Sequence, residues 1–130
     1  MCLMGFGRSY NDPWKFLCCS YFSEIVRHYF DSLMIMTFEQ FSSSLSQSTP
    51  PDEISDLLKA LWFDANNDWE AAHQIAQSRE GTPKYDRLHA YLHRVEGDAF
   101  NAGYWYRRAG AEIYKGTLKE EWAVLVKSLL

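Results

Sequence analysis

The chain carries two similar stretches, and their similarity decides the fold that the sequence predicts. The first, A-L-W-F-D-A-N-N-D-W-E-A-A-H-Q-I-A, begins at Ala60, and the second, A-Y-L-H-R-V-E-G-D-A-F-N-A-G-Y-W-Y, begins thirty residues later at Ala90. Further matching pairs are Asn67 with Gly97, Asp68 with Asp98, and Ala72 with Ala102. A repeat of this length is typical of stacked helical hairpins, in which no single unit buries its apolar face alone. The repeat therefore predicts an architecture rather than a chemistry.

Apolar residues recur at helical spacing from residue 51 onward, which predicts the first helix of the repeat. The stripe consists of Ile54, Leu57, Leu58, Leu61, Trp62 and Ala65. We expect this helix to begin near Pro51 and to end at Asn66 and Asn67, because asparagine tolerates the left-handed backbone that ends many helices. Asp68 is then expected to be the N-cap of the second helix, since its carboxylate can accept from free N–H groups there.

Three more helices are expected after the first pair. Thr82 and Pro83 predict the start of the third helix, and Gly97 predicts its end. The matching aspartate of the second copy is expected to cap the fourth helix. The last helix opens on Thr117 and Glu120, which have the spacing of a capping box. No stretch predicts a strand, so we expect an all-α fold of two antiparallel hairpins and a C-terminal helix.

Residues 1–35 differ in composition from the rest of the chain, and two interpretations of them stay open. The segment contains all three cysteines and no alanine. In one interpretation the native protein starts near Met36, and residues 1–35 are mis-assigned upstream sequence. In the other, Asp12 and Pro13 open an amphipathic helix, whose apolar residues recur at spacings of three and four.

The remaining chain is expected to form one domain preceded by a linker. We expect residues 36–50 to contain a short helix followed by a linker rich in serine and proline. Serine competes with the helix backbone for hydrogen bonds, and tandem proline stops a helix. Residues 51–130 are expected to form the helical repeat domain.

Composition argues against several classes of function. The net charge is −4, whereas proteins that bind nucleic acid or anionic lipid usually carry a basic surface. An odd number of cysteines, two of them adjacent, fits neither a disulfide framework nor a metal-binding spacing. No apolar run approaches the roughly 20 residues of a membrane span. We therefore expect a cytoplasmic protein without a cofactor, with no nucleic acid and no membrane as partners.

The junctions between the helices of each pair resemble those of the tetratricopeptide repeat. In that family the first helix of a hairpin ends in a Gly-Asp-aromatic turn, and a small alanine follows in the second helix. The matching residues here are Asn67, Asp68, Trp69 and Ala72 in the first copy, and Gly97, Asp98 and Ala102 in the second. The period is thirty residues here, against thirty-four in that family. The resemblance covers residues 51–130 and implies a short α-solenoid of two hairpins, with the last helix as its capping helix.

The second copy also resembles a small uncharacterised family of bacterial proteins. The similarity extends over H-A-Y-L-H-R-V-E-G-D-A-F-N-A-G-Y-W-Y-R-R-A-G, residues 89–110. It implies a bacterial protein of this fold and no particular reaction, and it favours a start near Met36.

The first hypothesis for function is a non-catalytic protein–protein interaction domain. Arg87, Tyr91 and Arg94 share one face of the third helix, and the tetratricopeptide resemblance implies that this face lines a groove for peptides. Two guanidiniums beside a tyrosine suit an acidic or carboxylate-ended segment. The alternative is a solvated face with Asp86 or Glu96 as ion partners, which contributes little. A two-hairpin array is also expected to extend itself by self-association.

The second hypothesis is a metal-binding or metal-dependent protein. His89, His93 and Glu96 share another face of the third helix, and His73 lies on the neighbouring helix. Imidazole and carboxylate ligands suit Zn²⁺ or a transition metal. The alternative is structural, because the tetratricopeptide resemblance places a packed aromatic ring at His93. No HExxH motif, nucleophile triad or phosphate loop is present, so we predict no catalytic residues.

Overall fold

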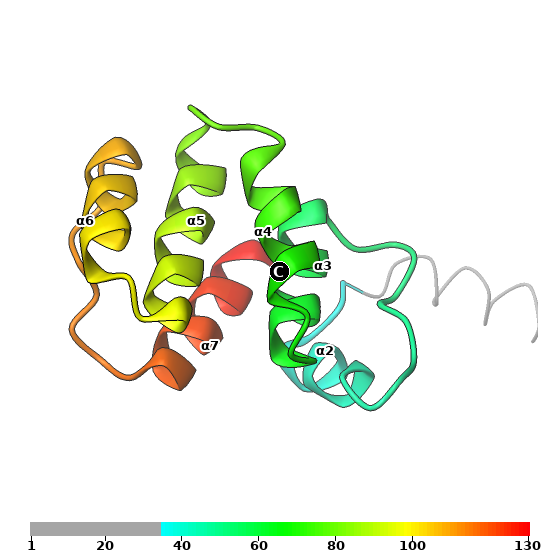
Figure 1. The fold of residues 1–130 in the computed structure, drawn as a ribbon. Helices are drawn as coiled ribbons and strands as arrows, with labels where there is room; N and C mark the ends of the chain where they lie inside the picture. Colours follow the sequence, from blue (N-terminus) through cyan, green and yellow to red (C-terminus); the bar gives the residue numbers. More distant parts are fainter. Residues whose placement is uncertain (1–34) are drawn as a thin grey trace, which may run out of the picture. The chain divides into compact units, whose positions relative to one another are not determined.

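The computed structural model describes residues 35–130, and within that range it contains six helices and no strand. The helices are α2 (Phe38–Ser44), α3 (Asp56–Ala65), α4 (Trp69–Gln77), α5 (Pro83–Glu96), α6 (Ala99–Arg108) and α7 (Leu118–Leu129) (Figure 1). The all-α prediction is confirmed for these residues. Both interpretations of residues 1–35 concern a segment that, apart from Ile35, lies outside the described residues. None of the helices between residues 35 and 130 has the length and apolar character needed to cross a bilayer.

Most helix starts are formed by the capping residues that the sequence predicts. The Asp68 carboxylate accepts from the N–H of Ala71 at 3.1 Å, and Asp98 makes the equivalent hydrogen bond at the start of α6 at 2.9 Å. Thr117 and Glu120 form the reciprocal capping box that opens α7. These bonds satisfy N–H groups that have no partner inside the helix.

The start of α3 differs from the prediction. The helix begins at Asp56 rather than near Pro51, and Ser55 is its N-cap. The Ser55 hydroxyl accepts from the N–H of Leu58 at 3.3 Å. Residues 52–54 form a turn before the helix. A serine hydroxyl is an effective cap, so the helix starts where that hydroxyl is available rather than at the tandem prolines.

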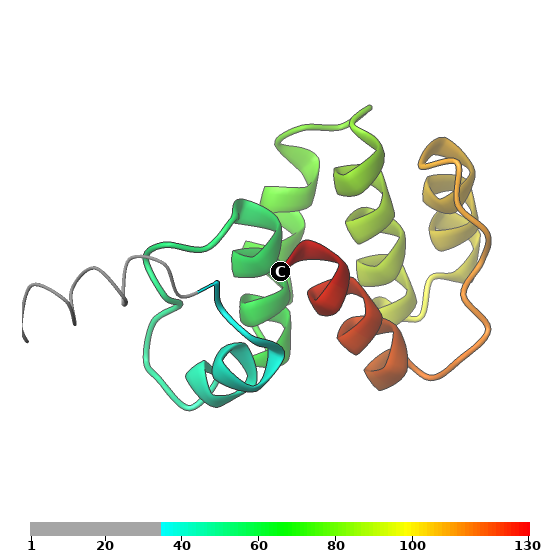
Figure 2. The same ribbon diagram turned by 180° about the vertical axis from the view of Figure 1, so that it is seen from behind.

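The helices of the two hairpins form a row, and α7 lies across it. Helix α3 packs against α4, α4 against α5, and α5 against α6. In Figure 1, α4, α5 and α6 lie side by side and alternate in direction. Helix α7 packs mainly on α5 and α3, and Figure 2 shows it crossing the face that these two helices form. The last helix thus covers a face of the hairpins. The relation to tetratricopeptide repeats stays a prediction.

Three indole N–H groups link neighbouring helices around the core. Trp62 of α3 donates to a carbonyl of α2 at 3.1 Å, Trp69 of α4 to one of α5 at 2.9 Å, and Trp122 of α7 to one of α3 at 3.0 Å. A carbonyl oxygen has a second lone pair for such a bond. Large apolar side chains of the core that are fully buried include Phe41, Leu61, Leu92 and Val126. Each indole therefore adds a directional contact to the burial of apolar area.

The turns inside the two hairpins both contain a residue with left-handed backbone. Gly97 has a φ of +90° and Asn67, the equivalent residue of the first copy, has a φ of 63°. A Cβ added at Gly97 would meet no atom within 4 Å. The demand for glycine at this position therefore comes from the backbone angle and not from crowding.

Replacing Gly97 is expected to weaken the fold through this backbone angle. Gly97→Ala should lower the free energy of unfolding by about 1 kcal/mol. Gly103→Ala is the matched control: its added Cβ would lie 3.6 Å from the Arg107 side chain, an ordinary contact inside α6. That substitution should raise the free energy of unfolding by up to about 1 kcal/mol. Urea denaturation followed by circular dichroism measures both, and a shift of the same sign in the two variants would contradict this explanation.

Candidate functional site

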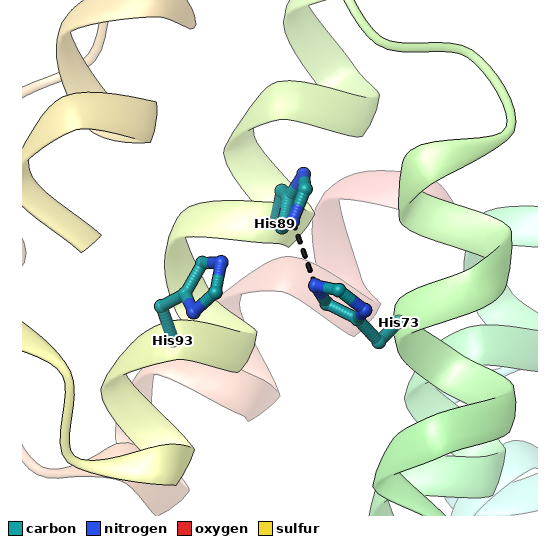
Figure 3. A group of neighbouring side chains, drawn as sticks. All are labelled: His73, His89 and His93. Carbon is teal, nitrogen blue, oxygen red and sulfur yellow. Dashed lines mark hydrogen bonds between the residues drawn. The ribbon is translucent and has the colours of Figure 1, made fainter. Parts of the chain in front are cut away.

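Three histidine side chains meet between α4 and α5. His73 comes from α4, whereas His89 and His93 lie one turn apart on α5 (Figure 3). One ring nitrogen from each histidine lies within 4.8 Å of the other two. The Nε2 atoms of His73 and His89 are 2.9 Å apart and share a hydrogen bond. One ring must donate and the other accept, so this bond is lost when both rings are protonated.

Two tryptophans hold the histidine rings in position. Trp69 stacks on His73 with the ring centres 4.4 Å apart, and Trp105 of α6 stacks on His89 at 3.8 Å. His89 also stacks on His93 at 4.9 Å. His89 is only 1% exposed, and its Nδ1 is buried without a hydrogen-bond partner among the described residues. The rings are thus fixed by packing, and one buried polar atom is left unsatisfied.

Glu96, the fourth residue of the predicted metal set, contacts one of the histidines. Its Oε2 lies 3.0 Å from His93 Nδ1. A carboxylate at this distance favours a proton on Nδ1, which leaves the lone pair on Nε2 of the same ring. Asp98 lies near this pair, but its carboxylate caps α6. The structure therefore brings the three predicted histidines together, and the fourth predicted residue, Glu96, contacts His93.

Burial keeps part of this cluster uncharged. The pKa of His89 is lowered to about 4, chiefly by burial and then by positive charge on His73, His93 and Arg108. The pKa of His73 is also lowered, first by burial and then by His93. His73 and His89 are therefore neutral at pH 7, with lone pairs available.

The three residues predicted to face a partner lie on one face of α5, and that face is turned toward α7 and α3. Arg87 Nη2 lies 2.6 Å from a carboxylate oxygen of Glu121, and Arg94 pairs with the other oxygen. Tyr91 is 3% exposed and its hydroxyl donates to Asp64 at 2.8 Å. The two arginine side chains are 18% and 20% exposed. All three residues make contacts within the chain, and their binding to a partner stays a prediction.

Glu121 of α7 is the residue of this region that the sequence analysis missed. Its side chain is fully buried. Besides the two arginines, the Tyr106 hydroxyl of α6 donates to it at 2.5 Å. Arg94 Nη2 donates in addition to the Gly116 carbonyl at 2.9 Å, just before α7. Removing a carboxylate from water costs several kcal/mol unless charged partners compensate, and here Arg87 and Arg94 do so.

Replacing the buried carboxylate is expected to destabilise the chain strongly. Glu121→Gln should lower the free energy of unfolding by about 3 kcal/mol, because it leaves two largely buried guanidiniums without a counter-charge. Glu112→Gln is the control, since Glu112 is exposed, and it should change stability by less than about 0.5 kcal/mol. Urea denaturation measures both. Similar losses of unfolding free energy in the two variants would contradict the explanation by a buried charge.

The stability of metal-free protein is expected to fall as the pH is lowered from 6.5 toward 4, the interval between the ordinary and the lowered pKa of His89. In this interval the unfolded chain binds a proton that the folded chain does not, so stability present above pH 6.5 is lost on acidification. The full loss amounts to about 3 kcal/mol. His89→Phe keeps a stacked ring and removes the titration. Urea denaturation in the presence of EDTA, repeated at a series of pH values, measures the free energy of unfolding. This free energy should depend less on pH in the variant, and an unchanged dependence would contradict the assignment to His89.

Comparison with known proteins adds no relative to this description. Neither models of protein families nor curated proteins nor solved structures yield a match to the chain. Function is therefore inferred from the geometry of the described residues.

Proposed function

We propose that residues 36–130 form a non-catalytic protein-interaction domain, which receives an acidic amphipathic helix on the face made by α3 and α5. One observation carries this proposal: α7 lies on that face and inserts the Glu121 carboxylate between Arg87 and Arg94. The arginines of α5 thus hold the type of ligand that their spacing predicts, supplied by the same chain. Helix-in-groove binding of this kind is a common mode of peptide recognition.

The donors that surround Glu121 are suited to select a carboxylate. Arg87 and Arg94 come from α5 and Tyr106 from α6, so one hairpin supplies them all. Arginine forms short, charge-assisted hydrogen bonds to carboxylates, and a neutral side chain in this place would leave two cations unpaired. The hairpin therefore discriminates between an acidic helix and a neutral one of similar shape.

Two pockets beside α7 support the proposal that another helix can occupy this face. The first has a volume of about 290 Å³, and its lining includes Leu61, Leu88, Leu125 and Leu129. The second has a volume of about 300 Å³, and its lining includes Tyr91, Val95, Leu118 and Trp122. Apolar space thus stays unfilled beside the C-terminal half of α7 and beside its N-terminal half. A partner helix with larger apolar side chains would gain contacts there that α7 does not make.

The connection to the rest of the chain gives α7 an advantage over a free partner. A tethered segment acts at an effective concentration on the order of millimolar. A partner helix must therefore bind more tightly than α7 does, by enough to offset this effective concentration, or bind a chain in which α7 has dissociated from the face. Self-association is the related outcome, because α7 of one copy can occupy the same face of a second copy.

The wider setting of the domain is also part of this proposal. We assign α3–α4 and α5–α6 to tetratricopeptide-like repeats that form a short α-solenoid, which the equivalent left-handed residues Asn67 and Gly97 support. A bacterial cytoplasmic protein is proposed from the sequence, on the similarity of residues 89–110 to bacterial proteins and on its cysteine pattern.

A labelled peptide of residues 117–130 tests the proposal against the full chain. Wild-type protein is expected to bind it weakly, because its own α7 occupies the face. The Glu121→Gln protein should bind the peptide at least tenfold more tightly, since the substitution weakens its own α7 by about 3 kcal/mol, equivalent to roughly 100-fold. Fluorescence anisotropy measures the affinity, and circular dichroism checks that the variant is folded.

A second peptide isolates the carboxylate in the same experiment. The 117–130 peptide with Glu121→Gln keeps the apolar stripe of α7 and should bind the Glu121→Gln protein at least about tenfold more weakly than the acidic peptide does. Equal affinity for the two peptides, or no binding of the acidic one, would sink the proposal. Light scattering of the variant at rising concentration separates self-association from peptide binding.

A further inference from the structure

The histidine group offers three nitrogen donors from two neighbouring helices. His89 and His93 project from one side of α5, and His73 reaches them from α4 (Figure 3). Neutral imidazole is a preferred ligand for Zn²⁺, Cu²⁺, Ni²⁺ and Co²⁺, whereas Mg²⁺ and Ca²⁺ take oxygen ligands. We propose that His73, His89 and His93 bind one Zn²⁺ ion or a similar divalent transition-metal ion.

The spacing of two of the three ring nitrogens is close to that of a tetrahedral site. Zn–N bonds of about 2.0–2.1 Å place two nitrogen ligands about 3.3 Å apart. The Nε2 atoms of His73 and His89 are 2.9 Å apart, so an ion between them requires a separation of only a few tenths of an ångström. The third nitrogen lies within 4.8 Å of the other two. Coordination by all three rings therefore requires the His93 nitrogen to move closer to the other two.

Glu96 prepares His93 for this role. A histidine that binds a metal through one nitrogen usually donates from the other to a carboxylate, which fixes the tautomer and strengthens the ligand. Glu96 Oε2 occupies that position, 3.0 Å from His93 Nδ1. Its negative charge also offsets part of the charge of the ion. The site thus contains an outer partner as well as its ligands.

The packing around the rings favours one defined geometry. Trp69 stacks on His73 and Trp105 stacks on His89, so each of these two rings has one face covered by an indole. In the present arrangement His73 and His89 share a single hydrogen bond, and the buried His89 Nδ1 has no partner among the described residues. An ion replaces this single bond with a coordinate bond to each ring. The three histidines leave a fourth position for water or a small ligand, as in three-histidine zinc sites.

The site is independent of the helix-binding face. Arg87, Tyr91 and Arg94 lie on the opposite side of α5 from His89 and His93, because residues two apart on a helix point in nearly opposite directions. Both α4 and α5 contribute ligands, so the ion links the first hairpin to the second. Failure of the peptide experiment leaves this proposal standing, and the reverse also holds.

Calorimetric titration of the untagged full chain tests the site. After EDTA treatment and its removal, Zn²⁺ is expected to bind wild-type protein at one ion per chain, and Mg²⁺ is expected to produce no heat. His73→Gln should weaken Zn²⁺ binding by more than about tenfold, and Glu96→Gln by about tenfold. His73 is only partly buried, so its replacement is tolerated by the core, and circular dichroism verifies this.

The remaining histidine of the chain supplies the matched control. His28 is the one histidine outside the group, and His28→Gln should bind Zn²⁺ as wild type does. Quenching by Cu²⁺ gives a second readout, because Trp69 and Trp105 stack on the proposed ligands, and His73→Gln should reduce it. If the rings are only packed aromatic groups, wild type and His73→Gln will bind Zn²⁺ equally or not at all. Either result overturns the proposal.

Discussion

A buried carboxylate needs positive charge close by, and this need at Glu121 determines where α7 lies. An apolar stripe alone would leave the register of α7 on α5 weakly specified, since leucine side chains fit neighbouring positions almost equally well. Two guanidiniums and a phenol meet at one point on the α5–α6 hairpin, and there they compensate the charge of Glu121. In that register Trp122, the next residue, donates to a carbonyl of α3, so α7 is bonded to the first hairpin as well as to the second.

Helix α5 is central because polar side chains are buried on two opposite sides of it. One side carries Arg87 and Arg94 and faces α7, whereas the other carries His89 and His93 and lies between α4 and α6. Buried polar groups are costly unless they are paired, so each side has a specific set of partners. A side chain that served only to fill the core would be apolar. Both proposals about function therefore rest on the polar side chains of this helix.

Local chemistry accounts for the parts of the fold that could be predicted. Asp68 and Asp98 were recognisable as caps because their hydrogen bonds are to the next residues in the chain. The two polar faces of α5 could be predicted from the helical period alone. The place of α7 could not be predicted in this way, because it depends on contacts between distant segments. One signal was present: Glu121 interrupts the apolar stripe between Leu118 and Trp122, and a charge at an inward position indicates a buried partner.

The histidine group could be predicted only in part, because it too depends on contacts between distant segments. Period placed His89 and His93 together, whereas the approach of His73 and the stacking of Trp105 depend on how α4 and α6 pack on α5. The start of α3 was misplaced because several capping signals compete within a few residues, and only the geometry of the folded turn selects Ser55.

The buried network also restricts how this sequence can diverge. Loss of Glu121 alone leaves two cations unpaired, and loss of either Arg87 or Arg94 alone leaves the carboxylate half-compensated. A set of apolar residues with similar total volume would fill the same space without any charge. A change of one member of this network at a time is costly, so we expect Glu121, its two arginines and Tyr106 to be exchanged together.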